Sequence, residues 1–400
     1  MALPQQCMDA SVFENLARQT FPTLDRVILY GVGEPLMHPG FLSLLKISRQ
    51  YLPEHGCIEF TTNGSLLAPA TLDAMRPYNL ARIIVSLDSP FNQKNEKLRQ
   101  GFSQDVMDNI THLSQSHGQG HPQAIAIETV VSRANLYDLP YLVQYCHDIG
   151  MPNLYVSHLH PYSDTMASLA LYTSVSQRAF EIMMDIAKSG WETVSRILLL
   201  PMYAKTINTE THPRLQTIFR QLDKARHEGV DIDLQKLTTL FQQAPQISET
   251  QEVFAEAQGL AEKLKINLKL PPLFVDPDKR ACPFIAYQAL FVTVDGTIVP
   301  CYNLAHPHSL YINRHHRQES PYQLGNISQS FTSLASLCAA HAPLFSRLQS
   351  MPQTVPWCGD CIYSTQNCYY VQNNESDCLG NQPSCNECLY STGFVKCLFD

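Results

Sequence analysis

Ten of the thirteen cysteines lie in the last third of the chain, and the spacing of nine of them constrains the structure more than any other feature. In two places, Cys358 to Cys361 and Cys385 to Cys388, two residues separate a pair. A step of this length turns both thiolates toward one metal centre. Two four-iron clusters need about eight thiolates, so the sequence predicts a metal-binding region. The nine candidate ligands are Cys282, Cys301, Cys358, Cys361, Cys368, Cys378, Cys385, Cys388 and Cys397.

Composition limits the class of protein. The chain has 400 residues, a hydrophobic content of 44% and a formal net charge of -8. Such a chain can bury a sizeable core, and its negative charge argues against a nucleic-acid or anionic-membrane surface. No segment approaches the roughly 20 apolar residues of a membrane span, and residues 1–18 show no signal-peptide pattern. We therefore expect a cytoplasmic protein, in which dense cysteines favour metal over disulfides.

The region 1–165 alternates short apolar strands with amphipathic helices. This order is typical of parallel strands joined by right-handed crossovers, and nearly continuous apolar runs such as Ile83-Ile84-Val85 indicate a sheet covered on both faces. Five such units are too few for a closed eight-fold barrel, so we predict an α/β fold with an open partial barrel. The predicted strands are 26–31, 57–62, 82–88, 124–131 and 153–158, and the predicted helices include 41–51, 69–76, 106–115 and 139–149.

The remaining chain divides into two further predicted regions. We expect 166–275 to be a helical insertion ending in a last barrel strand, and 276–400 to be a cysteine-rich domain that opens with a hairpin turn at Asp295-Gly296. The polar tract 306–320 is predicted to be an exposed loop. In the insertion, the predicted helices are 178–189, 193–205, 214–228 and 252–264, the polar connections include 208–213 and 242–249, and the strand is 266–270.

Polar residues cluster where the predicted strands end. The first strand is followed by Gly31-Val32-Gly33-Glu34-Pro35, the second by Thr62-Asn63-Gly64, and the third ends in Ser86-Leu87-Asp88. Ligand sites of parallel sheets lie at the carboxyl ends of the strands, so these residues predict a small-molecule site. His158 and His160, at the end of the fifth predicted strand, are the only histidine pair aimed at this site, and the pattern favours a core role over substrate contact.

These motifs together resemble the radical S-adenosylmethionine (SAM) superfamily. The resemblance covers about residues 20–165 and includes His38-Pro39 and Arg99-Gln100-Gly101 before Asn109. From Cys282 onward, the pattern Cys-x13-Gly-x4-Cys and the run 324–327 resemble the SPASM extension of maturases. The cysteine ladder is also similar to that of maturases for tungsten-dependent oxidoreductases. The resemblance implies a partial (β/α)6 TIM-type barrel followed by a small SPASM-like α+β domain.

The resemblance also implies ligands and partners. It implies that Glu34 and the residues around it bind the methionine moiety of SAM, and it places Ser86 and Asp88 near the SAM sugar or carboxylate. It implies two auxiliary [4Fe-4S] clusters, a peptide or protein substrate, and a reductant such as flavodoxin or ferredoxin. The expected SAM-contacting residues are Gly31, Gly33, Glu34, Pro35, Asn63, Ser86 and Asp88. One cluster is expected on Cys282, Cys301, Cys378 and either Cys385 or Cys388, and the other on Cys358, Cys361, Cys368 and Cys397.

Two departures accompany the resemblance. The extension's usual run is Cys-x2-Cys-x5-Cys-x3-Cys, whereas the gaps here are 2, 6 and 9, and a further Cys-x2-Cys follows. The superfamily holds its SAM-cleaving cluster by Cys-x3-Cys-x2-Cys after the first barrel strand, and this sequence contains no such motif. Because the Gly-Glu-Pro turn normally follows the second strand, we expect the chain to begin after the first strand, as a shortened chain without radical chemistry.

Three functional hypotheses remain open from the sequence. The first is a radical SAM/SPASM maturase that acts through a 5′-deoxyadenosyl radical. The second is a degenerate radical SAM-fold protein that binds a partner or transfers electrons. The third is a zinc-binding interaction module, in which Cys358, Cys361, Cys385 and Cys388 hold one zinc ion. The catalytic residues stay unassigned.

Overall fold

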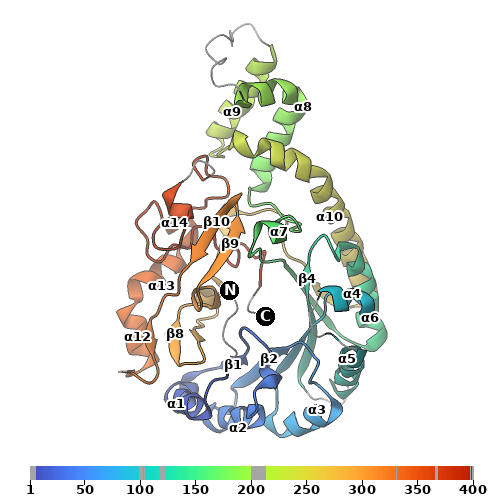
Figure 1. Ribbon diagram of the computed structural model, residues 1–400, viewed down its shortest axis with the longest axis vertical. Coiled ribbons are helices and arrows are strands. Elements are labelled where there is room, and N and C mark those ends of the chain that lie inside the picture. The colour runs from blue at the N-terminus through green and yellow to red at the C-terminus, as the bar shows by residue number, and fades with distance from the viewer. Residues whose placement is uncertain are drawn as a thin grey trace.

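The computed structural model describes residues 6–98, 102, 104–117, 122–199, 213–329, 331–364, 368–396 and 398, with only the backbone of 104, 189–199 and 213–215. Six parallel strands form one sheet in the order β1-β2-β3-β4-β5-β6, which wraps partway around an axis (Figure 1). This arrangement confirms the predicted α/β partial barrel. The strands are β1 (Arg26–Leu29), β2 (Cys57–Thr62), β3 (Arg82–Ser86), β4 (Ala124–Val131), β5 (Asn153–His158) and β6 (Asn267–Lys269).

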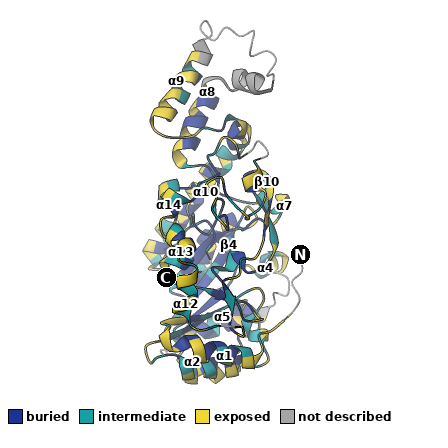
Figure 2. Cartoon of the chain, turned by 90° about the vertical axis from the view of Figure 1, so that its left-hand side faces the viewer, coloured by how far each residue is buried: buried dark blue, intermediate teal, exposed yellow. Residues whose placement is uncertain are grey.

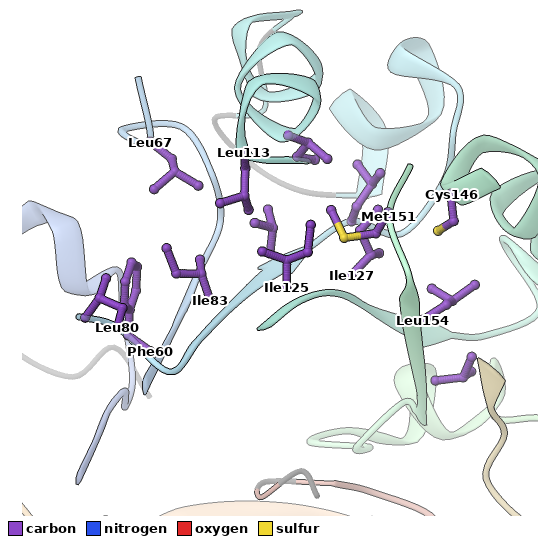
Figure 3. Packing of buried hydrophobic residues seen from close by; sticks show 14 of the residues in the cluster. Phe60, Leu67, Leu80, Ile83, Leu113, Ile125, Ile127, Cys146, Met151 and Leu154 are labelled. Carbon is purple, nitrogen blue, oxygen red and sulfur yellow. The ribbon is translucent and has the colours of Figure 1, made fainter. Parts of the chain in front are cut away.

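Helices cover the convex side of this sheet (Figure 1). Apolar residues alternate along each strand, so one set meets the helices and the other faces the inside of the barrel. Phe60, Ile83, Ile125 and Leu154 belong to the helix-facing set and pack in one core cluster, as Figure 3 shows. The covering elements are α1 (Ala10–Thr20), η1 (Phe21–Thr23), η2 (Pro35–Met37), α2 (Phe41–Tyr51), α3 (Pro69–Met75), η3 (Arg76–Tyr78), α4 (Asn92–Leu98), α5 (Gln104–His117), η4 (Leu136–Asp138) and α6 (Leu139–Ile149).

The inner face of the sheet carries polar side chains in one row. Strand pairing aligns Ser86 with Glu128, Glu128 with Tyr155, and Tyr155 with Lys269. Deeper in the barrel, Arg82 Nε donates to Glu59 Oε2 at 3.2 Å, and both side chains are 8% exposed. A buried ion pair of this kind is tolerated because each charge has its partner. The interior therefore presents polar groups near the strand ends, where the sequence places the ligand site.

A helical arm follows the fifth strand and projects beyond the sheet (Figure 1). Its second core, around Ile186, Ile218 and Leu240, is separate from the barrel core, and Figure 2 shows exposed residues along much of its surface. The arm contains α8 (Gln177–Leu199), α9 (Pro213–His227), η5 (Leu234–Lys236) and the first half of α10 (Leu237–Leu264), whose second half packs on the barrel core; α7 (Asp164–Ala167) lies beside β9.

Two expectations for the arm were wrong. The range 242–249 was predicted to be a polar connection, but it lies inside α10 together with Pro245. Helices 178–189 and 193–205 were predicted separately, yet one helix, α8, continues to Leu199, and 200–205 lie outside the described residues. A polar sequence on an exposed face is compatible with a helix when the opposite face packs, as Ile247 and Thr250 do here.

The C-terminal region has short strands and helices with many turns. The predicted hairpin is present, with Gly296 at φ +82° between β7 and β8. The tract 306–320 is not the predicted loop: most of it forms an antiparallel hairpin, and Arg317 is 1% exposed. The region contains η6 (Pro277–Lys279), α11 (Pro283–Ala286), β7 (Phe291–Val292), β8 (Thr297–Val299), η7 (Tyr302–Leu304), β9 (His308–Ile312), β10 (His315–Glu319), β11 (Gly325–Asn326), α12 (Leu334–Ala340), α13 (Ala342–Gln349), α14 (Met351–Thr354) and η8 (Tyr369–Val371).

Candidate functional site

Glu34 connects the ends of the first two strands. Its Oε1 accepts hydrogen bonds from Thr62 Oγ1 at 2.7 Å and from Leu36 N at 3.1 Å. Its Oε2 accepts from Asn63 N at 2.6 Å. Gly33 precedes it with φ +118°, a conformation that favours glycine. Since a carboxylate offers about four lone-pair positions, the described residues occupy three, and one on Oε2 is available to a ligand.

The next strand ends are held in a similar way. Asn63 Oδ1 accepts from Ser65 N at 2.9 Å, and Asn109 Nδ2 donates to Gly64 O at 2.9 Å. Asp88, which is 9% exposed, accepts at Oδ1 from Val130 N at 2.9 Å. These contacts fix the loops that follow β2 and β3. The motif Arg99-Gln100-Gly101 lies outside the described residues.

A pocket of ≈ 1180 Å³ runs along β1 and its following loop, beside the cysteine-rich region. Gly31, Gly33, Glu34 and Pro35 line one side, and the hairpin around Phe291 lines the other. The ring of Tyr30, which lines the pocket, stacks on that of Tyr302 at a centroid distance of 5.8 Å. Tyr302 directly follows Cys301, so this wall of the pocket is close in sequence to a candidate metal ligand. A concave site of mixed polarity at strand ends is where small ligands bind.

His158 and His160 lie in buried environments. His158, which is 1% exposed, packs among the rings of Tyr172, Phe254 and Phe394, and its Nε2 lies 2.9 Å from Pro272 O. Burial lowers the pKa of His158 to about 4 and that of His160 to about 3. Phe254 belongs to α10, so His158 faces the helical layer. The inner-face residues Tyr155 and Lys269 were not singled out from the sequence, although alternation along the strands places them in the polar row.

The first group of cysteines contains Cys282, Cys301, Cys385 and Cys388. Burial raises the pKa of Cys301 well above its usual value, and charges on the other three thiols raise it further. Cys282 packs against two apolar clusters. It shares one of them with Cys301 and the other with Cys385. Four thiols from three separate segments thus surround one volume.

The second group contains Cys358, Cys361, Cys368 and Cys378. Burial raises the pKa of Cys358, with further increases from Glu387, Cys361 and, less strongly, Cys378. Cys378 is similarly affected by Cys361 and Cys368. Asn386 Nδ2 lies 3.2 Å from Cys358 Sγ and donates to it. Cys397 lies outside the described residues.

This grouping corrects one expected assignment. Cys378 was assigned to the cluster of Cys282 and Cys301, but it lies with Cys361 and Cys368. The structure also separates the pairs that a single zinc site would require, because Cys358 and Cys361 are in one group and Cys385 and Cys388 in the other. In the parts of the chain that the structure describes, no three His, Cys, Asp or Glu residues are arranged to hold one metal ion.

The two groups fit iron–sulfur clusters better than single ions. Four thiolates around zinc lie within about 4 Å of one another, given Zn–S bonds of about 2.3 Å, whereas cluster ligands each bind a different iron and spread farther apart. Each group contains thiols whose pKa values burial raises, so deprotonating them together requires a bound cation. None of the twelve described cysteines forms a disulfide.

Comparison with known proteins agrees with these sites. Residues 8–131 match the radical SAM superfamily, and residues 282–362 match an iron-sulfur cluster-binding domain, SPASM. The chain is therefore similar to radical SAM proteins with a SPASM domain. These domains imply iron–sulfur clusters and SAM binding. The matched segments contain the Glu34 loop and four of the nine candidate cysteine ligands.

Relatives cover most of the chain at low identity. A tungsten-containing aldehyde ferredoxin oxidoreductase cofactor-modifying protein of Pyrococcus furiosus is 23% identical over 383 residues, which are 95% of this chain and 85% of that protein. Native anSMEcpe with bound AdoMet has a TM-score of 0.43 at 12% identity, covering 97% of this chain and 84% of that one. Streptococcus suis SuiB bound to S-adenosylmethionine has a TM-score of 0.41 at 11% identity, covering 75% and 56%.

Among the described residues, no helix combines the length and apolar content needed to cross a membrane.

Proposed function

We propose that this protein is a SAM-binding maturase whose C-terminal region holds two four-iron clusters. The observation that carries the proposal is the separation of eight cysteines into two groups of four. Cys282, Cys301, Cys385 and Cys388 hold the first cluster, and Cys358, Cys361, Cys368 and Cys378 hold the second. Cys397 remains a candidate ligand.

The barrel residues bind and orient SAM in this proposal. Gly31 and Gly33 allow the methionine moiety to approach the backbone, and the remaining lone pair of Glu34 accepts from its ammonium group. Pro35 and Asn63 shape the loops, while Ser86 and Asp88 lie toward the sugar or carboxylate. Aromatic residues such as Tyr30 and Tyr302 exclude water from the pocket. In the superfamily, SAM supplies a 5′-deoxyadenosyl radical that abstracts a substrate hydrogen.

The substrate is a peptide or protein, in keeping with the maturases that the C-terminal region resembles. The relative named as a cofactor-modifying protein supports a role in completing another enzyme. The pocket between the Glu34 loop and the first cysteine group has room for a segment of such a substrate beside SAM. A reductant protein such as a flavodoxin or ferredoxin supplies electrons.

Metal analysis after anaerobic reconstitution tests the proposal. The protein should take up about eight irons with matching sulfide. Replacing Cys358 and Cys361 together by alanine should remove about half, as should replacing Cys282 and Cys301. Cys378→Ala should affect the same cluster as the double replacement of Cys358 and Cys361. The spectrum of the cluster that remains identifies which of the two was lost.

Cys338→Ser is the matched control, because Cys338 lies in α12 outside both groups, and it should keep the full iron content. Zinc in place of iron, without sulfide, would contradict the proposal.

A further inference from the structure

Arg280 is a buried cation whose hydrogen-bond partners among the described residues are neutral. It follows η6 and is 3% exposed. Its Nη2 donates to Val355 O at 2.6 Å and its Nε to Pro277 O at 3.3 Å, and the guanidinium lies 5.3 Å from the ring centroid of Trp357. Among the ion pairs of the described residues, none includes Arg280.

A guanidinium removed from water needs a counter-ion, because carbonyl groups replace its hydrogen bonds but do not balance its charge. Arginine cannot solve this problem by losing its proton. The charge must therefore be balanced by an anion that becomes part of the site.

Both cysteine groups lie near this side chain, whose guanidinium contacts the residues directly before Cys358. Burial lowers the pKa of Arg280. The negative charges that oppose this shift belong, in order, to Cys388, Cys358 and Cys385, ahead of the exposed Asp278. Backbone contacts give the same location independently. Ala281 N donates to Ser391 O at 3.0 Å, close in sequence to Cys388, and Val355 is three residues before Cys358. Arg280 thus contacts the segment that leads to Cys358 and is next to a residue that binds the segment after Cys388.

We propose that Arg280 is the shared counter-ion of the two clusters and raises the reduction potential of both. This inference rests on the proposed function, since it requires both clusters to be present. A four-iron cluster with four thiolates is anionic and gains a further negative charge on reduction, so a nearby buried cation favours the reduced form. Proximity to both groups makes the effect common to both. Arg280 is a positioning residue for electron transfer and touches no substrate.

Redox titration followed by electron paramagnetic resonance tests the proposal on reconstituted protein. Arg280→Gln should bind the same iron as the wild type and shift both midpoint potentials downward. Arg280→Lys keeps the charge and should restore most of each shift. Lys279→Gln is the matched control. Lys279 is the neighbour of Arg280 in the sequence, but its side chain is 84% exposed, and water screens its charge. Both potentials should therefore stay at the wild-type values.

A second measurement covers the case in which Arg280→Gln holds iron poorly. The loss of thermal stability relative to the wild type should be larger in cluster-loaded protein than in cluster-free protein, because only the loaded form has the anions. Equal losses of thermal stability in the loaded and the cluster-free protein would overturn the proposal. So would an Arg280→Gln variant that binds the full amount of iron but shifts only one midpoint potential, or neither. Failure of the wild type to take up iron and sulfide would instead overturn the proposed function itself.

Discussion

Glu34 has two tasks at the residue scale. Three protein donors use its carboxylate to join the loop after β1 to the end of β2. Asp88 performs the same joining role between β3 and β4 through Val130 N. Residues that the sequence assigns to a ligand therefore also hold the loops in place, and a substitution affects both roles. A test of ligand contact must separate them.

Glu34→Ala should weaken SAM binding about ten- to hundredfold. The reason is the loss of a charge-assisted hydrogen bond from the SAM ammonium group, worth roughly 1.5–3 kcal/mol. Calorimetric titration of reconstituted protein with SAM measures the change.

Thr62→Val separates the two roles, because it removes one donor to Glu34 and leaves the carboxylate in place. Its SAM affinity should stay near that of the wild type. Equal weakening in both variants would assign the effect to the loop and remove Glu34 from the ligand site.

At the element scale, hydrophobic pattern predicted the buried strands well. The bounds of β2, β4 and β5 agree with the expected ranges, since strands covered on both faces are nearly continuous in apolar residues. The pattern failed for β10, whose sequence is His-His-Arg-Gln-Glu. Its buried side chains, Arg317 and Glu319, pair with each other at 2.6 Å. A strand stabilised by buried ion pairs has no hydrophobic alternation for a sequence reading to detect.

The end of β5 gives the fold a dependence on pH. Burial is the main cause that lowers the pKa of His158 from 6.5 to about 4, and the positive charge of Lys396 adds to it, while the hydrogen bond to Pro272 opposes it. Between these two values the unfolded chain binds more protons than the folded chain. Stability should therefore fall as the pH drops from 6.5 toward 4, by about 1.4 kcal/mol per pH unit for this residue, and should be unaffected above 6.5.

Urea unfolding across that window measures the slope. His158→Phe keeps a ring among Tyr172, Phe254 and Phe394 and loses the contact with Pro272 at every pH. The variant should be less stable at neutral pH, yet its stability should decline less steeply on acidification. Slopes that coincide in the two proteins would show that His158 does not titrate as described.

At the scale of the whole molecule, three regions meet at the second cysteine group. Asp360 Oδ1 accepts from Ser176 N at 2.8 Å, and Trp357 Nε1 donates to Ser174 O at 3.0 Å, so the segment leading to the arm contacts the cysteine turn. Lys236, from η5 of the arm, donates to Gly359 O. The arm is therefore part of the support for the second cysteine group, which lies far from it in sequence.

The sequence predicts candidate ligands but not how they group in space. Spacing along the chain predicts that Cys358 and Cys361 share a centre, since two residues separate them. It does not establish which group Cys378 joins, because that depends on how the turns after η8 return to the domain. The contacts of Lys236 and Asp360 were equally inaccessible, since they join segments more than a hundred residues apart.

Lys236→Met should loosen the second cluster while leaving the first in place. The lysine side chain is 5% exposed, and its replacement leaves Gly359 O without this donor and removes a positive charge near Asp360 and Glu387. A buried carbonyl such as Gly359 O left without its donor costs about 1–3 kcal/mol. Roughly half of the iron should therefore be lost faster to a chelator, as followed by visible absorbance. Lys224→Met, in α9 with a side chain 67% exposed, is the control and should release iron as the wild type does. If both halves of the iron leave faster together, the arm stabilises the domain as a whole and gives the second cluster no separate support.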